Sequence, residues 1–195
     1  TYIPVILPDM QLDASQLDLE LARPSQTGHN LFAFPAQSNF SGVRHPLALI
    51  ATARSRGWHV LLDAAAFVPT HRLDLRVATP DFVTVSFYKM FGYPTGVGCL
   101  LVRDDALAVL RRPWFAGGTV NFATVQGCLH VLSPREAGFE DGTLDYLGIP
   151  AVEIGLRHLE RVGMDTIQTR VHYLTDWLLT ELLALRHGNG RPLVR

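Results

Sequence analysis

The chain has 195 residues, of which 48% are apolar and 18% are charged, and its formal net charge is −1. This composition is typical of an ordinary soluble globular protein and by itself selects no function. The sequence has no basic run and no apolar stretch longer than a strand. We therefore expect neither a nucleic-acid partner nor a membrane span.

Apolar segments of strand length alternate with helical segments over the first 110 residues. A helix is predicted over residues 46–56, with Pro46 in its first turn and Gly57 at its end. Asp104 is expected to cap a short helix over residues 106–110. Strands are predicted over residues 31–37, 58–63, 81–87 and 97–103. This alternation predicts an α/β protein with a mainly parallel sheet.

The two ends of the chain depart from this pattern. Near the start, Asp18, Glu20 and Arg23 indicate a solvated connection. From residue 148 onward, apolar residues recur at helical spacing and predict helices over residues 149–162 and 165–185. The second helix carries an apolar stripe that we expect to pack in the core or against another domain. The stripe consists of Ile167, Val171, Leu174, Leu178 and Leu182.

A domain boundary is expected between the two C-terminal helices. Residues 188–190 predict a turn, and residues 192–195 are expected to start the first strand of a small C-terminal domain. We therefore assign residues 1–162 to a large domain and residues 163–195 to a long helix with the start of a small domain. Because the chain begins at Thr1, we expect the large domain to be incomplete at its N-terminus.

Asp63 ends the strand predicted over residues 58–63, and Lys89 follows the strand predicted over residues 81–87. Ligands bind to open α/β sheets outside the carboxyl ends of the strands, so both side chains can reach one pocket. An amine and a carboxylate there suit pyridoxal phosphate, which forms a Schiff base with a lysine and needs a carboxylate beside its pyridine nitrogen. Phe87, Met90 and Phe91 surround the lysine in sequence and could exclude water from its amine, which favours the nucleophilic form.

Plainer interpretations of the same residues remain open on spacing alone. Lys89 could extend from a strand end into solvent, and Asp63 could cap a turn. Asn39 could belong to a turn that Ser41 and Gly42 complete.

Longer motifs favour the cofactor interpretation. Six segments, in this order, resemble the class V aminotransferase family and within it the molybdenum cofactor sulfurases. They are FPAQSNFSGVR (34–44), LDAAAFVPT (62–70), DFV (81–83), SFYKMFGYPTGVG (86–98), GGT (117–119) and FEDGT (139–143). The resemblance spans residues 31 to about 162. It implies the large domain of a fold-type-I pyridoxal-phosphate-dependent transferase.

The resemblance also implies roles for individual residues. Lys89 matches the Schiff-base lysine, and Asp63 matches the partner of the pyridine nitrogen. Asn39 matches a residue near the phenolic oxygen of the cofactor. Ser86 matches a phosphate-binding serine, and Thr143 matches a threonine that reaches the phosphate of the neighbouring subunit in related dimers. We therefore expect pyridoxal 5′-phosphate as cofactor and a homodimer.

Two positions depart from the usual cysteine desulfurase pattern. Tyr88 stands where cysteine desulfurases usually carry a histidine, and Ala66 replaces a glutamine near the phenolic oxygen. Both departures favour the sulfurase branch, although an alanine cannot hydrogen-bond a phenolate and a tyrosine is a weaker proton carrier at neutral pH. Tyr88 nevertheless stays among the expected cofactor-binding residues.

The expected activity is sulfur transfer from L-cysteine, which releases alanine, through a cysteine persulfide to the molybdenum cofactor. The resemblance places the persulfide cysteine after residue 195 and a phosphate loop before residue 1, so we expect these 195 residues alone to be inactive. The alternatives are another class V enzyme, such as a plain cysteine desulfurase, a lyase or an epimerase, and a degenerate module that does not catalyse.

The cysteines and histidines suggest no further chemistry. Cys99 and Cys128 are expected to be reduced packing residues of a cytoplasmic protein, since the chain shows no signal-peptide pattern. No two histidines have the spacing that places two ligands on one helix face, so no metal is expected. His71 is the histidine that could border the pocket, although a loop histidine is more often only solvated.

Overall fold

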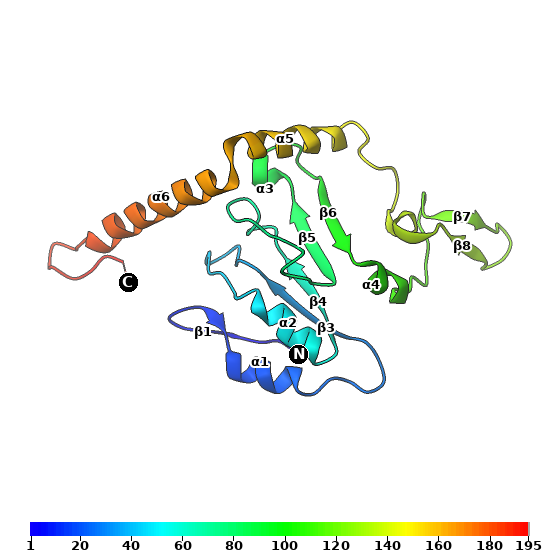
Figure 1. Ribbon diagram of the computed structural model, residues 1–195, viewed down its shortest axis with the longest axis horizontal. Helices are drawn as coiled ribbons and strands as arrows, with labels where there is room; N and C mark the ends of the chain where they lie inside the picture. The colour runs from blue at the N-terminus through cyan, green and yellow to red at the C-terminus, as the bar shows by residue number, and fades with distance from the viewer. Residues whose placement is uncertain (195) are drawn as a thin grey trace.

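The computed structural model describes residues 1–194 and contains a central four-stranded sheet (Figure 1). The strands lie in the order β3, β4, β5, β6, where the first three are parallel and β6 runs antiparallel to β5. Their bounds are β3 (Asn30–Pro35), β4 (Trp58–Asp63), β5 (Phe82–Ser86) and β6 (Gly98–Val102). The predicted α/β class and mainly parallel sheet are confirmed.

Two helices cover one face of this sheet, and together they form the core. α1 (Ala14–Leu21) and α2 (Ala48–Ser55) lie on the same side of the strands (Figure 1). The buried cluster contains Leu17 and Leu21 of α1, Ile50 and Ala53 of α2, and Phe32, Phe34, Val60, Leu62 and Val83 of the sheet. Alternate strand residues therefore point toward these helices. The other face carries exposed apolar residues, among them Leu31 and Leu100, which are 51% and 53% exposed.

The solvated connection expected near the start is wrong, because this segment forms α1. Asp13 caps the helix, and its Oδ1 accepts hydrogen bonds of 3.0 Å from the backbone N–H groups of Ser15 and Gln16. Leu17 and Leu21 lie four residues apart and face the core. Asp18 is exposed on the same helix, Glu20 is half-buried, and Arg23 lies beyond the helix end, so these charges do not mark a solvated connection.

The carboxylate of Asp81 ties the amino ends of the sheet together. It lies just before β5, and its side chain is only 5% exposed. One oxygen accepts the backbone N–H of Val60 at 2.8 Å, and the guanidinium groups of Arg54 and Arg103 lie 3.7 and 3.6 Å from the carboxylate. The His59 ring is 4.0 Å away. A carboxylate so deeply buried needs these partners.

Most of the remaining elements follow β5 in the chain, whereas one hairpin precedes α1. They are α3 (Tyr88–Phe91), α4 (Asp104–Val109), α5 (Ile149–Val162) and α6 (Met164–Ala184), with hairpins β1 (Val5–Ile6) with β2 (Gln11–Leu12) and β7 (Val120–Ala123) with β8 (His130–Leu132), and the 3₁₀ helix η1 (Arg135–Phe139). Asp104 is the first residue of α4 and not its cap. Its carboxylate accepts a hydrogen bond from Arg135 at 2.7 Å. α5 matches its predicted range, and α6 begins and ends one residue earlier than predicted.

α6 extends away from the sheet, and none of its residues is buried (Figure 1). The stripe predicted to pack is therefore largely exposed here, with Leu174 at 40% and Leu178 at 49%. The predicted turn at residues 188–190 is present, since the N–H of Gly190 donates to His187 O at 2.8 Å. The predicted strand at 192–195 is reduced to a single bridge between Pro192 and Arg186, and residue 195 lies outside the described residues. None of the helices described is long and apolar enough to cross a membrane.

Candidate cofactor-binding site

The carboxyl ends of β4 and β5 bring the predicted site residues to one edge of the sheet. Asp63 is the last residue of β4 and Ser86 the last of β5, and Lys89 follows in the single turn of α3. The register pairs Asp63 with Thr84 of β5. Gly92 ends α3 with φ +82°, a conformation that glycine adopts without strain. The chain thus returns into β6 immediately after presenting the lysine.

Lys89 is the only lysine in the chain. Its Nζ donates a 2.9 Å hydrogen bond to Oδ1 of Asn39, a residue 50 positions earlier in the turn that follows β3. The lysine side chain is half-buried, and the asparagine is exposed. The fold therefore brings these two predicted site residues into direct contact from two different strand ends.

Asp63 is held through one of its two oxygens. Oδ1 accepts the backbone N–H of Ala65 at 3.0 Å and the hydroxyl of Thr84 at 3.2 Å. No residue among 1–194 donates a hydrogen bond to its Oδ2. The carboxylate is exposed, so this oxygen can accept a hydrogen bond from a bound molecule. Sequence reasoning missed Thr84, whose signal is a hydroxyl residue paired across the sheet with a strand-end carboxylate.

The three other predicted site residues, Ser86, Tyr88 and Thr143, differ in their position relative to this edge of the sheet. Ser86 is half-buried at the end of β5, and the Tyr88 side chain is 46% exposed at the start of α3. Thr143 lies in the segment between η1 and α5. Within the described residues, no hydrogen bond joins it to Lys89, Asp63 or Ser86. The structure thus gathers five of the six predicted residues at one sheet edge and leaves Thr143 apart from them.

His71 borders this edge and contacts Arg44, which follows the turn of Asn39. Arg44 Nη1 donates to His71 Nε2 at 2.8 Å, and the histidine's Nδ1 lies 2.8 Å from the Thr70 hydroxyl. Its ring stacks on Phe67 with centroids 4.9 Å apart. Burial, and then the charge of Arg44, lower the pKa of His71 below its usual value. The neutral ring thus links the turns that follow β3 and β4.

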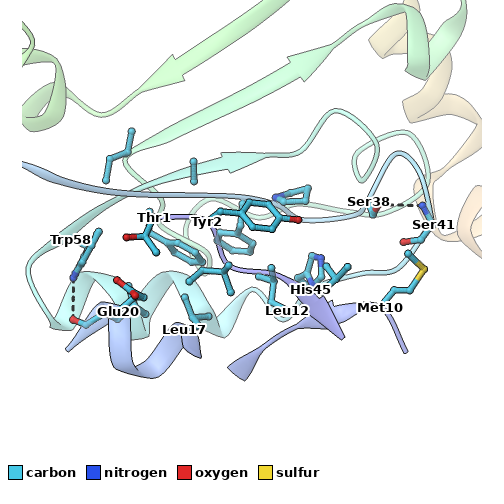
Figure 2. A pocket seen from close by; sticks show the side chains of 18 of the residues that line it. Thr1, Tyr2, Met10, Leu12, Leu17, Glu20, Ser38, Ser41, His45 and Trp58 are labelled. Carbon is cyan, nitrogen blue, oxygen red and sulfur yellow. Dashed lines mark hydrogen bonds between the residues drawn. The ribbon is translucent and has the colours of Figure 1, made fainter. Parts of the chain in front are cut away.

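A separate cavity of about 540 Å³ lies along the free edge of β3 (Figure 2). Its walls come from β3, from the N-terminal segment with Tyr2 and Met10, and from His45 and Trp58. Figure 2 shows Ser38 and Ser41 at one end, in the turn that also carries Asn39. Neither Lys89 nor Asp63 lines this cavity, so it is distinct from the strand-end site.

The cysteines and possible metal ligands add nothing to this site. Cys99 is half-buried in β6, and burial raises the pKa of its thiol, whereas Cys128 is exposed. No group of three or more histidine, cysteine, aspartate or glutamate side chains within residues 1–194 is arranged to hold a metal ion.

The groups at the strand ends fit pyridoxal phosphate by the chemistry of the donor set. The amine of Lys89, the free carboxylate oxygen of Asp63 and the hydroxyl of Ser86 suit an aldehyde, a pyridine nitrogen and a phosphate, respectively. The mainly parallel sheet and this edge define an α/β protein of the fold-type-I pyridoxal phosphate class. The sequence profile described as Aminotransferase class-V matches residues 8–189, and the chain belongs to that family.

Individual relatives agree with this family. The chain is 42% identical over 207 residues to the molybdenum cofactor sulfurase of Bos taurus, covering 99% of this chain and 23% of that protein. It is 42% identical over 167 residues to the molybdenum cofactor sulfurase of Caenorhabditis elegans, covering 85% of this chain and 24% of the relative. The chain thus spans about a quarter of the length of these curated relatives.

A solved structure shares the fold at detectable sequence similarity. The apo cysteine desulfurase of Thermococcus onnurineus superposes with a TM-score of 0.76 at 27% identity, over 91% of this chain and 43% of that one. The predicted fold class is therefore confirmed. The assignment of roles to single residues stays a prediction, which the geometry above makes testable.

Proposed function

We propose that the protein carrying this chain binds pyridoxal phosphate at the carboxyl ends of β4 and β5. Lys89 would hold the cofactor's aldehyde carbon, and the free Oδ2 of Asp63 would accept a hydrogen bond from its pyridine nitrogen. Asn39 would lie beside the phenolic oxygen and Ser86 at the phosphate. When bound, the cofactor supplies an electron sink for bonds at the substrate Cα. The observation that carries the proposal is the 2.9 Å contact between Lys89 and Asn39 beside the half-free carboxylate of Asp63.

The protein's own residues have separable tasks in this site. The amine of Lys89 removes and returns a proton at the substrate Cα, because it is the basic group at the sheet edge. Asp63 keeps its charge directed at the pyridine nitrogen, since Ala65 and Thr84 fix its Oδ1. Tyr88 starts the turn that carries Lys89, and His71 contacts Arg44 beside the same edge.

The relatives favour sulfur transfer from L-cysteine. The substrate would lose its sulfur to an enzyme thiol and leave as alanine, and the resulting cysteine persulfide would carry the sulfur to the molybdenum cofactor. The 42% identity to molybdenum cofactor sulfurases supports this acceptor. A homodimer supplies Thr143 to the phosphate of the other subunit. A cytoplasmic location and a domain boundary near residue 162 complete the proposal.

A plain cysteine desulfurase is the second candidate, favoured by the solved relative with that name. The two functions differ in the sulfur acceptor. A full-length protein that releases alanine from L-cysteine but leaves the molybdenum cofactor unsulfurated would favour the second candidate. No alanine release at all would favour a module that does not catalyse.

The cofactor assignment can be tested by reductive trapping. Because Lys89 is the only lysine among these 195 residues, borohydride reduction in the presence of pyridoxal phosphate should label this part of the protein once, on the peptide containing residue 89, found by mass spectrometry. Lys89→Arg keeps the charge and should lose both the label and the visible absorbance band. Persistence of the label elsewhere in Lys89→Arg would contradict the assignment.

Asp63→Asn separates cofactor binding from rate. Asparagine keeps the size of the side chain and removes the charge opposite the pyridine nitrogen. The lost charge-assisted hydrogen bond is worth roughly 2 to 4 kcal/mol in a site closed to water. We therefore expect retained cofactor and a rate of alanine release lower by roughly 30-fold to 1,000-fold, since about 1.4 kcal/mol corresponds to tenfold in rate. Release at the wild-type rate would exclude the proposed role of Asp63.

A further inference from the structure

Residues 112–143 form a small lobe that contains Thr143 and is organised around a buried arginine. The lobe comprises the β7–β8 hairpin and η1, and it projects to one side of the sheet beyond β6 and α4 (Figure 1). The side chain of Arg112 is only 6% exposed, although its ion-pair partner Asp141 is 58% exposed. A guanidinium is rarely buried without a specific task, because removing its charge from water is costly.

Arg112 holds the segment that leads to Thr143 at two points. Its Nη1 donates to the carbonyl of Gly138 at 3.2 Å, and its Nη2 donates to the carboxylate of Asp141. The guanidinium also lies 5.6 Å from the ring of Trp114. One side chain thus fixes both ends of residues 138–141, and Thr143 follows two residues later.

A second contact locks the same segment against a glycine loop. The N–H of Gly142 donates to Gly117 O at 2.7 Å. Gly118 has φ +84°, and a Cβ there would lie 2.8 Å from Gly142 O, so only glycine permits this approach. The buried hydroxyl of Thr119 donates to Ala116 O at 2.7 Å and closes the loop. The turn carrying Thr143 therefore rests on a rigid support.

The choice of arginine carries a cost that a lysine would avoid. The Nε of Arg112 is buried and has no hydrogen-bond partner within residues 1–194. A buried donor left unpaired destabilises a protein, because its hydrogen bond to water is lost and not replaced. A lysine has no such atom, but its single ammonium cannot reproduce the planar fork that bridges Gly138 and Asp141. The two hydrogen bonds to Gly138 and Asp141 therefore require arginine at position 112, although lysine would leave no unpaired buried donor.

We propose that Arg112 is a positioning residue that holds the turn of residues 138–143 so that the hydroxyl of Thr143 meets a phosphate group in a fixed orientation. This inference rests on the proposed function, in which that phosphate belongs to pyridoxal phosphate in the neighbouring subunit. Arg112 itself does not touch the cofactor. It acts through Asp141 and the backbone of Gly138.

The test compares pyridoxal phosphate with pyridoxal, which has the same ring and aldehyde but no phosphate, in the full-length protein. Arg112→Met and Thr143→Ala should each weaken pyridoxal phosphate binding by about tenfold, the loss of one hydrogen bond to a charged group. Both should leave the affinity for pyridoxal unchanged. The double variant should be no weaker than Arg112→Met alone, because both changes remove the same contact.

Three controls keep the outcome decisive. Arg111→Met removes the neighbouring arginine, which is exposed and donates only to the carbonyls of Ala108 and Leu110, and it should change neither affinity. Arg112→Lys preserves the charge and should behave like Arg112→Met if the fork matters. Asp141→Asn changes an exposed residue, so it should fold and show a smaller loss for pyridoxal phosphate alone.

Two results would overturn the positioning role while the proposed function stands. One is unchanged pyridoxal phosphate affinity in both Arg112→Met and Asp141→Asn. The other is equal weakening of pyridoxal and pyridoxal phosphate, which indicates general damage to the fold. A wild-type protein that binds neither compound, and whose Lys89 is never labelled, overturns the proposed function and this inference together.

Discussion

Gly155 in α5 is expected to be intolerant of alanine because α5 packs on the short helix that carries Lys89. A Cβ built on Gly155 would lie 2.5 to 2.6 Å from three ring atoms of Phe91. Carbon atoms in good contact lie about 3.5 to 4.0 Å apart, so the ring or the helix must move by about 1 Å. Phe91 has little freedom, since its ring stacks on Phe87 with centroids 6.1 Å apart.

Two effects of Gly155→Ala oppose one another, and their magnitudes decide the sign. In an open helix, alanine replaces glycine with a gain of about 1 kcal/mol. Overpacking a buried contact costs about 1 to 3 kcal/mol. We therefore expect the free energy of unfolding to change between about zero and a loss of 2 kcal/mol, and not to rise. The helix of Lys89 should loosen as well, because it bears the clash.

Urea unfolding measures the global effect, and hydrogen exchange measures the local one. Exchange should accelerate at the N–H groups of Phe91 and Gly92, which bond to Phe87 O and Tyr88 O at 3.2 and 2.8 Å. Phe91→Leu removes the clashing ring, and in that background Gly155→Ala should become neutral or stabilising. If Gly155→Ala alone stabilises the protein by about 1 kcal/mol, the packing of α5 on α3 described above is wrong.

Two further predictions concern stability. Asp81→Asn should reduce the free energy of unfolding by roughly 2 to 3 kcal/mol in urea titrations, less than for a fully buried pair because Arg54 and Arg103 are 31% and 36% exposed. Burial lowers the pKa of His45, so the unfolded state gains the proton first as pH falls. Stability should be full above the unfolded value of about 6.5 and decrease below it, and His45→Gln should flatten this dependence. A stability that rises on acidification from pH 7 to 5.5 would contradict that sign.

The sequence predicted the sheet because its strands are apolar on one face and end at polar residues. Residues 58–63 form β4 as expected, and the C-terminal helix over 149–162 has the predicted bounds. The helix α1 was not predicted because three charged residues indicated a solvated segment. The spacing of Leu17 and Leu21 and the capping residue Asp13 are the signals for this helix. Local sequence patterns therefore predicted the elements with one clear apolar periodicity, such as β4 and α5. They did not predict α1, where charged residues are interspersed with the apolar ones.

The candidate site was predicted in part by a different kind of information. The contact between Lys89 and Asn39 joins residues 50 positions apart, and spacing alone left both with plainer interpretations. Only the resemblance of whole motifs to a known family linked them. The partnership of Asp63 with Thr84 depends on strand register, which single-sequence patterns do not fix. Thr143 forms no hydrogen bond to Lys89, Asp63 or Ser86 within the described residues, and the phosphate contact proposed for it across a subunit interface is a prediction that sequence spacing could not supply.

Asp81 and Asp63 lie at opposite ends of the parallel strands, and their hydrogen bonds suit one to stabilising the fold and the other to binding a ligand. Asp81, at the amino end, has partners for both oxygens: Val60 and Arg54 at Oδ2, and Arg103 at Oδ1. Asp63, at the carboxyl end, is exposed and engaged through Oδ1 only. A saturated buried carboxylate can stabilise but has no capacity for a ligand, whereas a half-engaged exposed one adds little stability and can accept a hydrogen bond. Asparagine at position 81 should therefore lower stability more than asparagine at position 63, and asparagine at position 63 should alter the cofactor's absorbance spectrum more. The reverse order would mean that the carboxyl edge of this sheet is not where the cofactor binds.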